Sequence, residues 1–168
     1  MNTLTASEAP AQFLSFMLGQ DMFAMGILAV REILEYAGVT PVPQMPSCIS
    51  GVINLRGTAV PVLDLACRLE REPVAVGKRT CIIVVEVDGD GNTGGAFVIG
   101  ILVDAVNAVL DIPPSEVEPA PSLGAQVRAE MLQGIGKVNG RFVLLLDVRR
   151  VASVGDLAAI APAALDHV

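Results

Sequence analysis

The sequence contains very little histidine and few aromatic residues. Only one of its 168 residues is histidine, His167, and 4% are aromatic, with no tryptophan. A single histidine excludes a two-histidine metal site and leaves no basis for a histidine-based catalytic triad. The acids Asp64, Glu86, Asp104 and Asp147 each follow an apolar run, which favours turn caps at strand ends over a catalytic pair. We therefore predict that the protein is not an enzyme.

Long apolar runs are also missing, although the mean hydropathy is +0.60. The run at 96–103 ends at Asp104 and the run at 82–85 ends at Glu86, whereas a membrane-spanning helix needs about 18 or more apolar residues. The first residues have neither the basic segment nor the apolar core of a signal peptide. The sequence predicts a cytoplasmic protein without direct membrane insertion.

Positive charge is scarce, with 11 Lys and Arg against 18 Asp and Glu and a net charge of -7. The electrostatic field of a net negative protein repels phosphate backbones, so we predict no nucleic-acid partner. The sequence has an odd number of cysteines, and no two of them have CxxC spacing. They are Cys48, Cys67 and Cys81. We expect neither a disulfide framework nor a zinc site, and each cysteine to be a small buried hydrophobic residue.

The segment 88–95 begins like a calcium-binding loop. Thr93 and Ile99 then stand where such a loop needs Gly and Glu, so we interpret the segment as a flexible hairpin loop. No glycine-rich phosphate loop is present either. We predict no metal and no cofactor.

Glycine and proline interrupt the chain at short intervals, with 16 Gly and 11 Pro, which is typical of many short strands. Asn139-Gly140 predicts a two-residue type I′ hairpin turn. We also expect a short helix over 27–34, a helical turn capped by Asp64, and a helix over 157–167. The clearest strands are predicted at 13–18, 52–55, 59–63, 81–87, 96–103 and 141–146.

An internal repeat is the most informative feature of the sequence. The segment 51–65 aligns without gaps on 134–148 with identical residues at 5 of 15 positions, and FAMGIL from Phe23 matches FVIGIL from Phe97. The repeat predicts two related β units, roughly 13–70 and 78–150, that close into small barrels and pack on each other. Whether the N-terminal strand crosses over from one unit to the other stays open.

Asn54-Leu55-Arg56-Gly57 stands out between two predicted strands. The simplest interpretation is a turn with an exposed arginine. Arginine is also enriched in protein interfaces, because its planar guanidinium makes several directed hydrogen bonds. Both interpretations stay open at this point.

Six segments in a fixed order make the sequence resemble the CheW family of chemotaxis coupling proteins over about 13–152. INLRG followed by VPVLDL is the most specific of these matches. The resemblance implies a mostly β fold of two packed SH3-like five-stranded barrels with short helices, over 13–150, flanked by tails at 1–12 and 153–168. The segments are FLSFMLG at 13–19, ILAVREIL at 27–34, GVINLRGTAVPVLDL at 51–65, GILVDAV at 100–106, VEPAP at 117–121 and MLQGIGKVNGRFVLLLDV at 131–148.

The same resemblance implies a non-catalytic adaptor that couples the cytoplasmic tip of methyl-accepting chemoreceptors to the regulatory domain of a CheA-type histidine kinase, at membrane-associated receptor arrays. The receptor-binding positions that it implies are Val30, Glu32, Ile33, Gly51, Asn54, Leu55, Arg56 and Gly57. The kinase-binding positions that it implies are Gly100, Val106, Val109 and Gly134.

The glycines leave two interpretations open. If Gly134 lies in the kinase interface, Gly134→Glu should abolish docking without unfolding, and if it serves barrel curvature, the same change should unfold the protein.

Alternatives for the function are a coupling protein of another chemosensory pathway, such as pilus motility, and a small-molecule-binding β protein. A β-barrel hydrolase would need paired acids facing one cavity.

Overall fold

The computed structural model describes residues 11–46, 48–88, 96–119 and 129–152. The predicted helix at 157–167 and most of the predicted loop at 88–95 lie outside these ranges. Eleven strands dominate the described chain, which confirms the mostly β prediction. The strands are β1 (Ala11–Leu18), β2 (Asp21–Gly26), β3 (Val30–Glu35), β4 (Ile49–Leu55), β5 (Thr58–Asp64), β6 (Cys81–Val87), β7 (Phe97–Val103), β8 (Ala105–Ile112), β9 (Val117–Glu118), β10 (Leu132–Val138) and β11 (Arg141–Leu146).

The helices are short and connect strands. None of those in the described ranges has both the length and the apolar character needed to cross a membrane. They are the α-helices α1 (Leu65–Arg68) and α2 (Val148–Ala152) and the 3-10 turns η1 (Ile27–Ala29), η2 (Pro114–Glu116) and η4 (Ala129–Met131).

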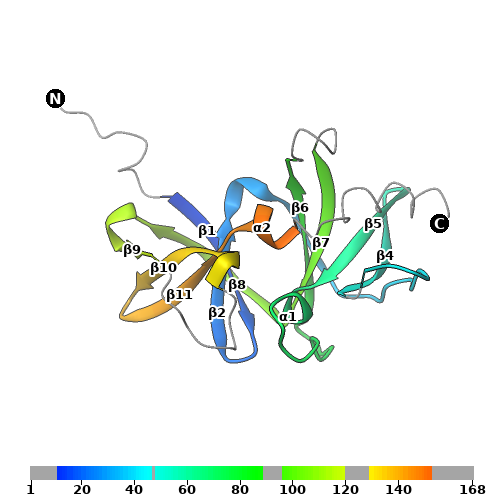
Figure 1. The fold of residues 1–168 in the computed structure, drawn as a ribbon, viewed down its shortest axis with the longest axis horizontal. Helices are drawn as coiled ribbons and strands as arrows, with labels where there is room; N and C mark the ends of the chain where they lie inside the picture. The colour runs from blue at the N-terminus through cyan, green and yellow to red at the C-terminus, as the bar shows by residue number, and fades with distance from the viewer. Residues whose placement is uncertain (1–10, 47, 89–95, 120–128, 153–168) are drawn as a thin grey trace.

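The strands form two sheets that lie side by side, with α1 and α2 between them (Figure 1). Sheet A has the order β8-β1-β2-β11-β10-β9, and sheet B has the order β3-β6-β7-β5-β4. The sheets do not coincide with the sequence halves 13–70 and 78–150, because β1 and β2 pair with β8 and β11 of the second half. Each half thus contributes its first two strands to one sheet and its remaining strands to the other.

The β4–β5 and β10–β11 hairpins are equivalent, which confirms the repeat. Every paired residue of the first corresponds to a paired residue 83 positions later, from Ile49↔Leu63 and Leu132↔Leu146 at the base to the turn. Both contain a bulge at the same place, and Asn139-Gly140 has φ of 51° and 79°, as a type I′ turn requires.

The predicted helix over 27–34 is wrong beyond its first turn, because η1 is followed directly by β3. The three-residue spacing of Val30 and Ile33 has another cause. The register of β3 on β6 shifts between Val30 and Glu32, so Val30 pairs with Val85 and Ile33 with Ile83. A bulge therefore keeps two apolar residues on one sheet face at a spacing that imitates a helix.

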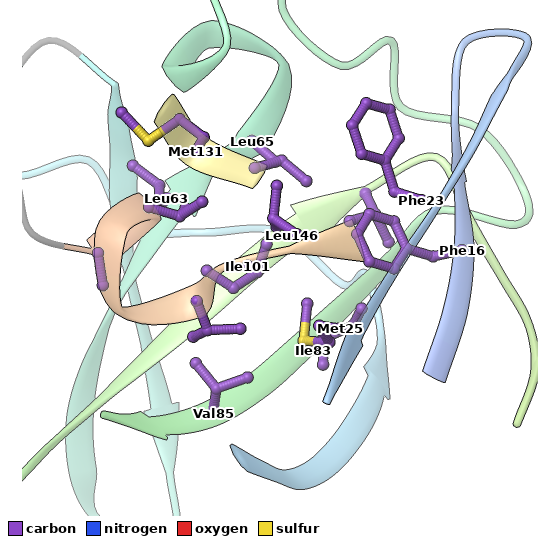
Figure 2. Close-up of a cluster of buried hydrophobic side chains, with 14 of the residues drawn as sticks. Phe16, Phe23, Met25, Leu63, Leu65, Ile83, Val85, Ile101, Met131 and Leu146 are labelled. Carbon is purple, nitrogen blue, oxygen red and sulfur yellow. The ribbon is translucent and has the colours of Figure 1, made fainter. Parts of the chain in front are cut away.

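The largest hydrophobic cluster lies between the sheets and joins them (Figure 2). Phe16, Phe23 and Met25 of sheet A meet Ile83 and Ile101 of sheet B, and all five are fully buried. Each sheet has a smaller cluster of its own on its other side. The two sheets therefore pack on each other through this cluster.

Two cysteines form a disulfide bond, so the prediction of no disulfide is wrong. Cys48 precedes β4 and Cys67 lies in α1, and their Cα atoms are 5.5 Å apart. The bond closes the base of the β4–β5 hairpin, which brings together residues that lie 19 positions apart. Counting cysteines misses this bond because the pairing depends on the hairpin. Cys81, in β6, is free and half-buried.

Candidate protein-binding site

The site centres on the tight turn between β4 and β5. Arg56 and Gly57 form it, with φ of 52° and 87°, and the side-chain oxygen of Asn54 accepts a hydrogen bond from the Gly57 amide at 2.7 Å. A positive φ is unfavourable for most residues other than glycine and asparagine. The turn therefore holds an arginine in a conformation that its residue type does not favour, and presents its side chain outward.

Arg56 makes a two-pronged ion pair with Glu32 of β3. Its two terminal nitrogens donate hydrogen bonds of 2.7 and 3.0 Å to the two carboxylate oxygens. The Arg56 hydrogen bond is the main cause that lowers the pKa of Glu32, and the reverse contact raises the pKa of Arg56. The Arg56 side chain is 73% exposed and that of Glu32 is 26% exposed.

The ion pair also reports on the shape of sheet B. β3 and β4 are its two edge strands, yet the turn at the end of β4 reaches Glu32 on β3. The sheet must therefore curl strongly, as an SH3-like fold requires. A second contact near this edge is the bridge between Thr40 and Val52.

A shallow hollow of about 280 Å³ adjoins the ion pair. Leu55 and Val98 form its accessible apolar part, with the buried Val60 and Val84 beneath them. Charged groups stand beside this apolar part, an arrangement typical of a protein-binding surface with an apolar centre and a polar rim. The lining residues are Arg31, Glu32, Leu55, Arg56, Thr58, Val60, Val84 and Val98.

The structure brings only some of the predicted receptor positions together. Glu32, Leu55 and Arg56 surround the hollow, whereas Val30 and Ile33 pair with strand residues of the other face of sheet B. Gly51 is buried, and a Cβ there would lie 2.4 Å from the Thr40 carbonyl oxygen. Gly51 therefore permits a close backbone contact beneath the surface.

The predicted kinase positions also divide into two kinds. Gly100 and Gly134 are buried, and a Cβ would approach Ile82 to 2.7 Å at the first and the Glu118 carbonyl oxygen to 2.9 Å at the second. The packing of their own sheets accounts for both glycines. Val106 and Val109 lie on β8, an edge strand of sheet A, and Val109 is 49% exposed.

Sequence reasoning missed a larger surface hollow of about 540 Å³ near the start of β1 and η1. Leu28 lines it and is 99% exposed. The repeat could not reveal this, because the aligned residue Leu102 is 4% exposed in the other copy. Within the described ranges, no three His, Cys, Asp or Glu residues are grouped closely enough to hold a metal ion.

Comparison with known proteins identifies the family. Residues 12–155 match the family model of the CheW-like domain. A chemotaxis protein CheW of Klebsiella aerogenes is 32% identical over 167 residues, which cover 99% of this chain and 96% of the relative. Protein FrzA of Myxococcus xanthus is 33% identical over 138 residues, covering 82% and 81% of the two chains.

A solved structure agrees with this assignment. The crystal structure of the scaffolding protein TtCheW from Thermoanaerobacter tengcongensis has a TM-score of 0.75 and 28% identity, with 87% of this chain and 94% of that chain covered. The fold and the sequence therefore point to the same relatives, and the chain belongs to the CheW-like family.

Proposed function

We propose that this protein is a non-catalytic adaptor that couples methyl-accepting chemoreceptors to a CheA-type histidine kinase. The observation that carries the proposal is the exposed Arg56, held in an unfavourable turn conformation and aligned by Glu32 beside an apolar hollow. A residue kept in a costly conformation is commonly one that serves function. Family membership supports the same role.

The receptor would dock on the face formed by Glu32, Leu55, Arg56 and the neighbouring valines. A helical hairpin can lay apolar side chains on such a hollow, while Arg56 donates hydrogen bonds to acidic or carbonyl oxygens at its rim. Glu32 fixes the direction of the guanidinium before binding, which reduces the entropy lost when the complex forms.

The test is Arg56→Ala against the purified cytoplasmic hairpin of a chemoreceptor. We expect weaker receptor binding, with a melting temperature within about 2 °C of the wild type, because the side chain is exposed. Arg141→Ala is the matched control, since Arg141 is also an exposed arginine beside a hairpin turn. Unchanged receptor affinity in folded Arg56→Ala protein would refute the assignment.

The kinase would bind along the edge strand β8. Val109 offers exposed apolar surface there, next to the half-buried Val106, and an edge strand can pair with a strand of another barrel. Gly100 and Gly134 are buried under close contacts, so a substitution there would disturb the packing of the protein itself. A loss of kinase binding in such a variant would therefore not locate the interface.

Val109→Glu tests this surface more directly. We expect it to weaken binding of the kinase regulatory domain while receptor binding survives, since it places a charge in an interface that excludes water. Val76→Glu adds the same charge at another exposed valine and should leave both affinities unchanged. Wild-type kinase affinity in folded Val109→Glu protein would place the kinase elsewhere.

The proposal locates the protein in the cytoplasm, at membrane-associated receptor arrays. Its second candidate function is a coupling protein of another chemosensory pathway, because the similar FrzA carries a name other than chemotaxis protein. A pull-down from the native cell that identifies the co-purifying kinase and receptor separates the two. Capture of a receptor and kinase from the flagellar pathway supports the first, and capture of those from a pilus pathway supports the second.

A further inference from the structure

The disulfide between Cys48 and Cys67 lies where the two equivalent hairpins differ. In both hairpins the backbone closes the base in the same way, since the Asp64 amide donates to the Cys48 carbonyl and the Asp147 amide to the Met131 carbonyl, each at 2.8 Å. The β10–β11 hairpin has Met131 at the position of Cys48 and Arg150 at the position of Cys67. The repeat thus builds this base without a disulfide, so the fold itself does not require the bond.

Both cysteines of the bond are partly accessible. Cys48 and Cys67 are half-buried, neither enclosed in the core nor fully exposed, and their Cα separation of 5.5 Å lies in the range of ordinary disulfides. Partly exposed disulfides exchange with small thiols more readily than enclosed ones. The proposed function places the protein in the cytoplasm, and this inference rests on that function. Cytoplasmic disulfides are usually transient and redox-sensing.

We propose that Cys48 and Cys67 form a reversible redox site whose substrate is a low-molecular-weight disulfide such as oxidised glutathione. One cysteine thiolate attacks a glutathione sulfur, forming a mixed disulfide and releasing one glutathione. The second thiolate then attacks the protein sulfur of that mixed disulfide and releases the other glutathione. The protein dithiol is oxidised, glutathione disulfide is reduced to two thiols, and the two protons of the protein thiols pass to them.

The site controls the rigidity of the surface that carries Arg56. β4 is an edge strand of sheet B, so its only strand neighbour is β5, with the single Thr40–Val52 bridge on its other side. Oxidation covalently joins the chain before β4 to α1 at the far end of β5, and so limits opening of the hairpin. Reduction leaves the strand ladder and the backbone hydrogen bond to hold it. The oxidised state therefore favours the aligned Arg56–Glu32 pair.

The experiment compares the full wild-type chain in buffers of reduced and oxidised glutathione. Alkylation followed by mass spectrometry measures the fraction of bonded Cys48–Cys67, and hydrogen exchange measures the protection of β4, with β10 as the internal control. We expect both thiols to become bonded in excess oxidised glutathione and to be released in excess reduced glutathione. The chain-entropy model of a loop of this length predicts protection higher by up to the order of 100-fold in the oxidised state for β4 amides that exchange when the hairpin opens. β10 amides that exchange by local opening should be unchanged, and these serve as the control.

Cysteine variants give a second reading. Cys81→Ser should keep the redox response, whereas Cys48→Ser and Cys67→Ser should give β4 the protection of the reduced wild type in every buffer. If a variant does not fold, the wild-type comparison still decides the matter. Thiols that stay unbonded in oxidised glutathione, a bond that resists reduced glutathione, or β4 protection that does not follow the bond would overturn the proposal.

Receptor affinity is measured in the same two buffers. Tighter binding by the oxidised chain, absent in Cys48→Ser, extends the redox site to signalling. A chain that exchanges its disulfide with the expected change in β4 but binds no receptor would contradict only the adaptor function. A chain that binds receptor equally in both states would confine the redox effect to hairpin rigidity and overturn its link to docking.

Discussion

The β4–β5 and β10–β11 hairpins share one register, one bulge and one kind of turn, yet they differ in the residues that the turn presents. Arg56 and Asn139 occupy the same turn position with nearly the same φ, 52° and 51°. Asparagine is a favoured residue for this conformation and arginine is not. Of the two hairpins, only the first departs from the local preference, and its arginine pairs with Glu32 across sheet B.

Substitutions of the buried glycines Gly51 and Gly134 test the close backbone contacts that the two hairpins share. A Cβ at Gly51 would meet the Thr40 backbone oxygen at 2.4 Å, and one at Gly134 would meet the Glu118 oxygen at 2.9 Å. We expect Gly51→Ala to lower the free energy of unfolding by about 2–3 kcal/mol and Gly134→Ala by about 1–2 kcal/mol, because backbone must move in both. Urea denaturation with constant m-value measures this.

Gly77→Ala is the control for these variants, since a Cβ at Gly77 has no neighbour within 4 Å. It should change the free energy of unfolding by less than about 0.5 kcal/mol. A Gly51→Ala protein as stable as Gly77→Ala would show that the close contact with Thr40 is not retained in solution.

Exchanging Arg56 and Asn139 tests the difference between the two turns. Asn139→Arg should cost about 1 kcal/mol, because it places arginine at a positive φ. Arg56→Asn relieves the same strain but loses the exposed ion pair with Glu32, so the two effects oppose each other and the loss of stability should be smaller than for Asn139→Arg. Denaturation of both variants measures this, and an equal loss of stability in the two would remove the argument that Arg56 is strained.

The smallest expected effect is the pH dependence of the Glu32–Arg56 pair. The pKa of Glu32 is lowered from 4.5 in the folded protein, chiefly by the Arg56 hydrogen bond. The pair therefore stabilises the fold above about pH 4.5, and this contribution is lost as the pH falls through the lowered pKa. The difference in melting temperature between wild type and Glu32→Gln should be small at pH 7 and vanish in acid.

Glu35→Gln controls for the loss of an acid from the same strand, because Glu35 is exposed on β3. If the melting difference for Glu32→Gln grew as the pH fell, the ion pair would not be the cause.

Local patterns in the sequence predicted several strands and turns well, but not β2 or β8, which lie outside the predicted strands. The strands at 81–87 and 141–146 have the predicted bounds, and Asp64 caps α1 by accepting a hydrogen bond from the Cys67 amide at 3.2 Å. These features depend on neighbours in sequence. The segment 27–34 was misread because a bulge and a helix can give the same apolar spacing.

Features that depend on distant segments could not be predicted in the same way. Glu32 and Arg56 were each singled out, but their pairing follows from the curl of sheet B. The Cys48–Cys67 bond likewise follows from the hairpin that brings its ends together. Gly51 and Gly134 are identical in the repeat, but the sequence does not show that backbone atoms of Thr40 and Glu118 pack against them. These contacts depend on the fold.

The exchange of strands between sheets sets an order for the growing chain. Sheet B is built from the continuous stretch β3 to β7, whereas β1 and β2 of sheet A wait for β8 and β11. A polypeptide leaving the ribosome can therefore complete sheet B before sheet A, which contains the first two described strands. Until β11 is made, β2 has no parallel partner and one of its edges stays open, although β1 and β2 can already pair with each other.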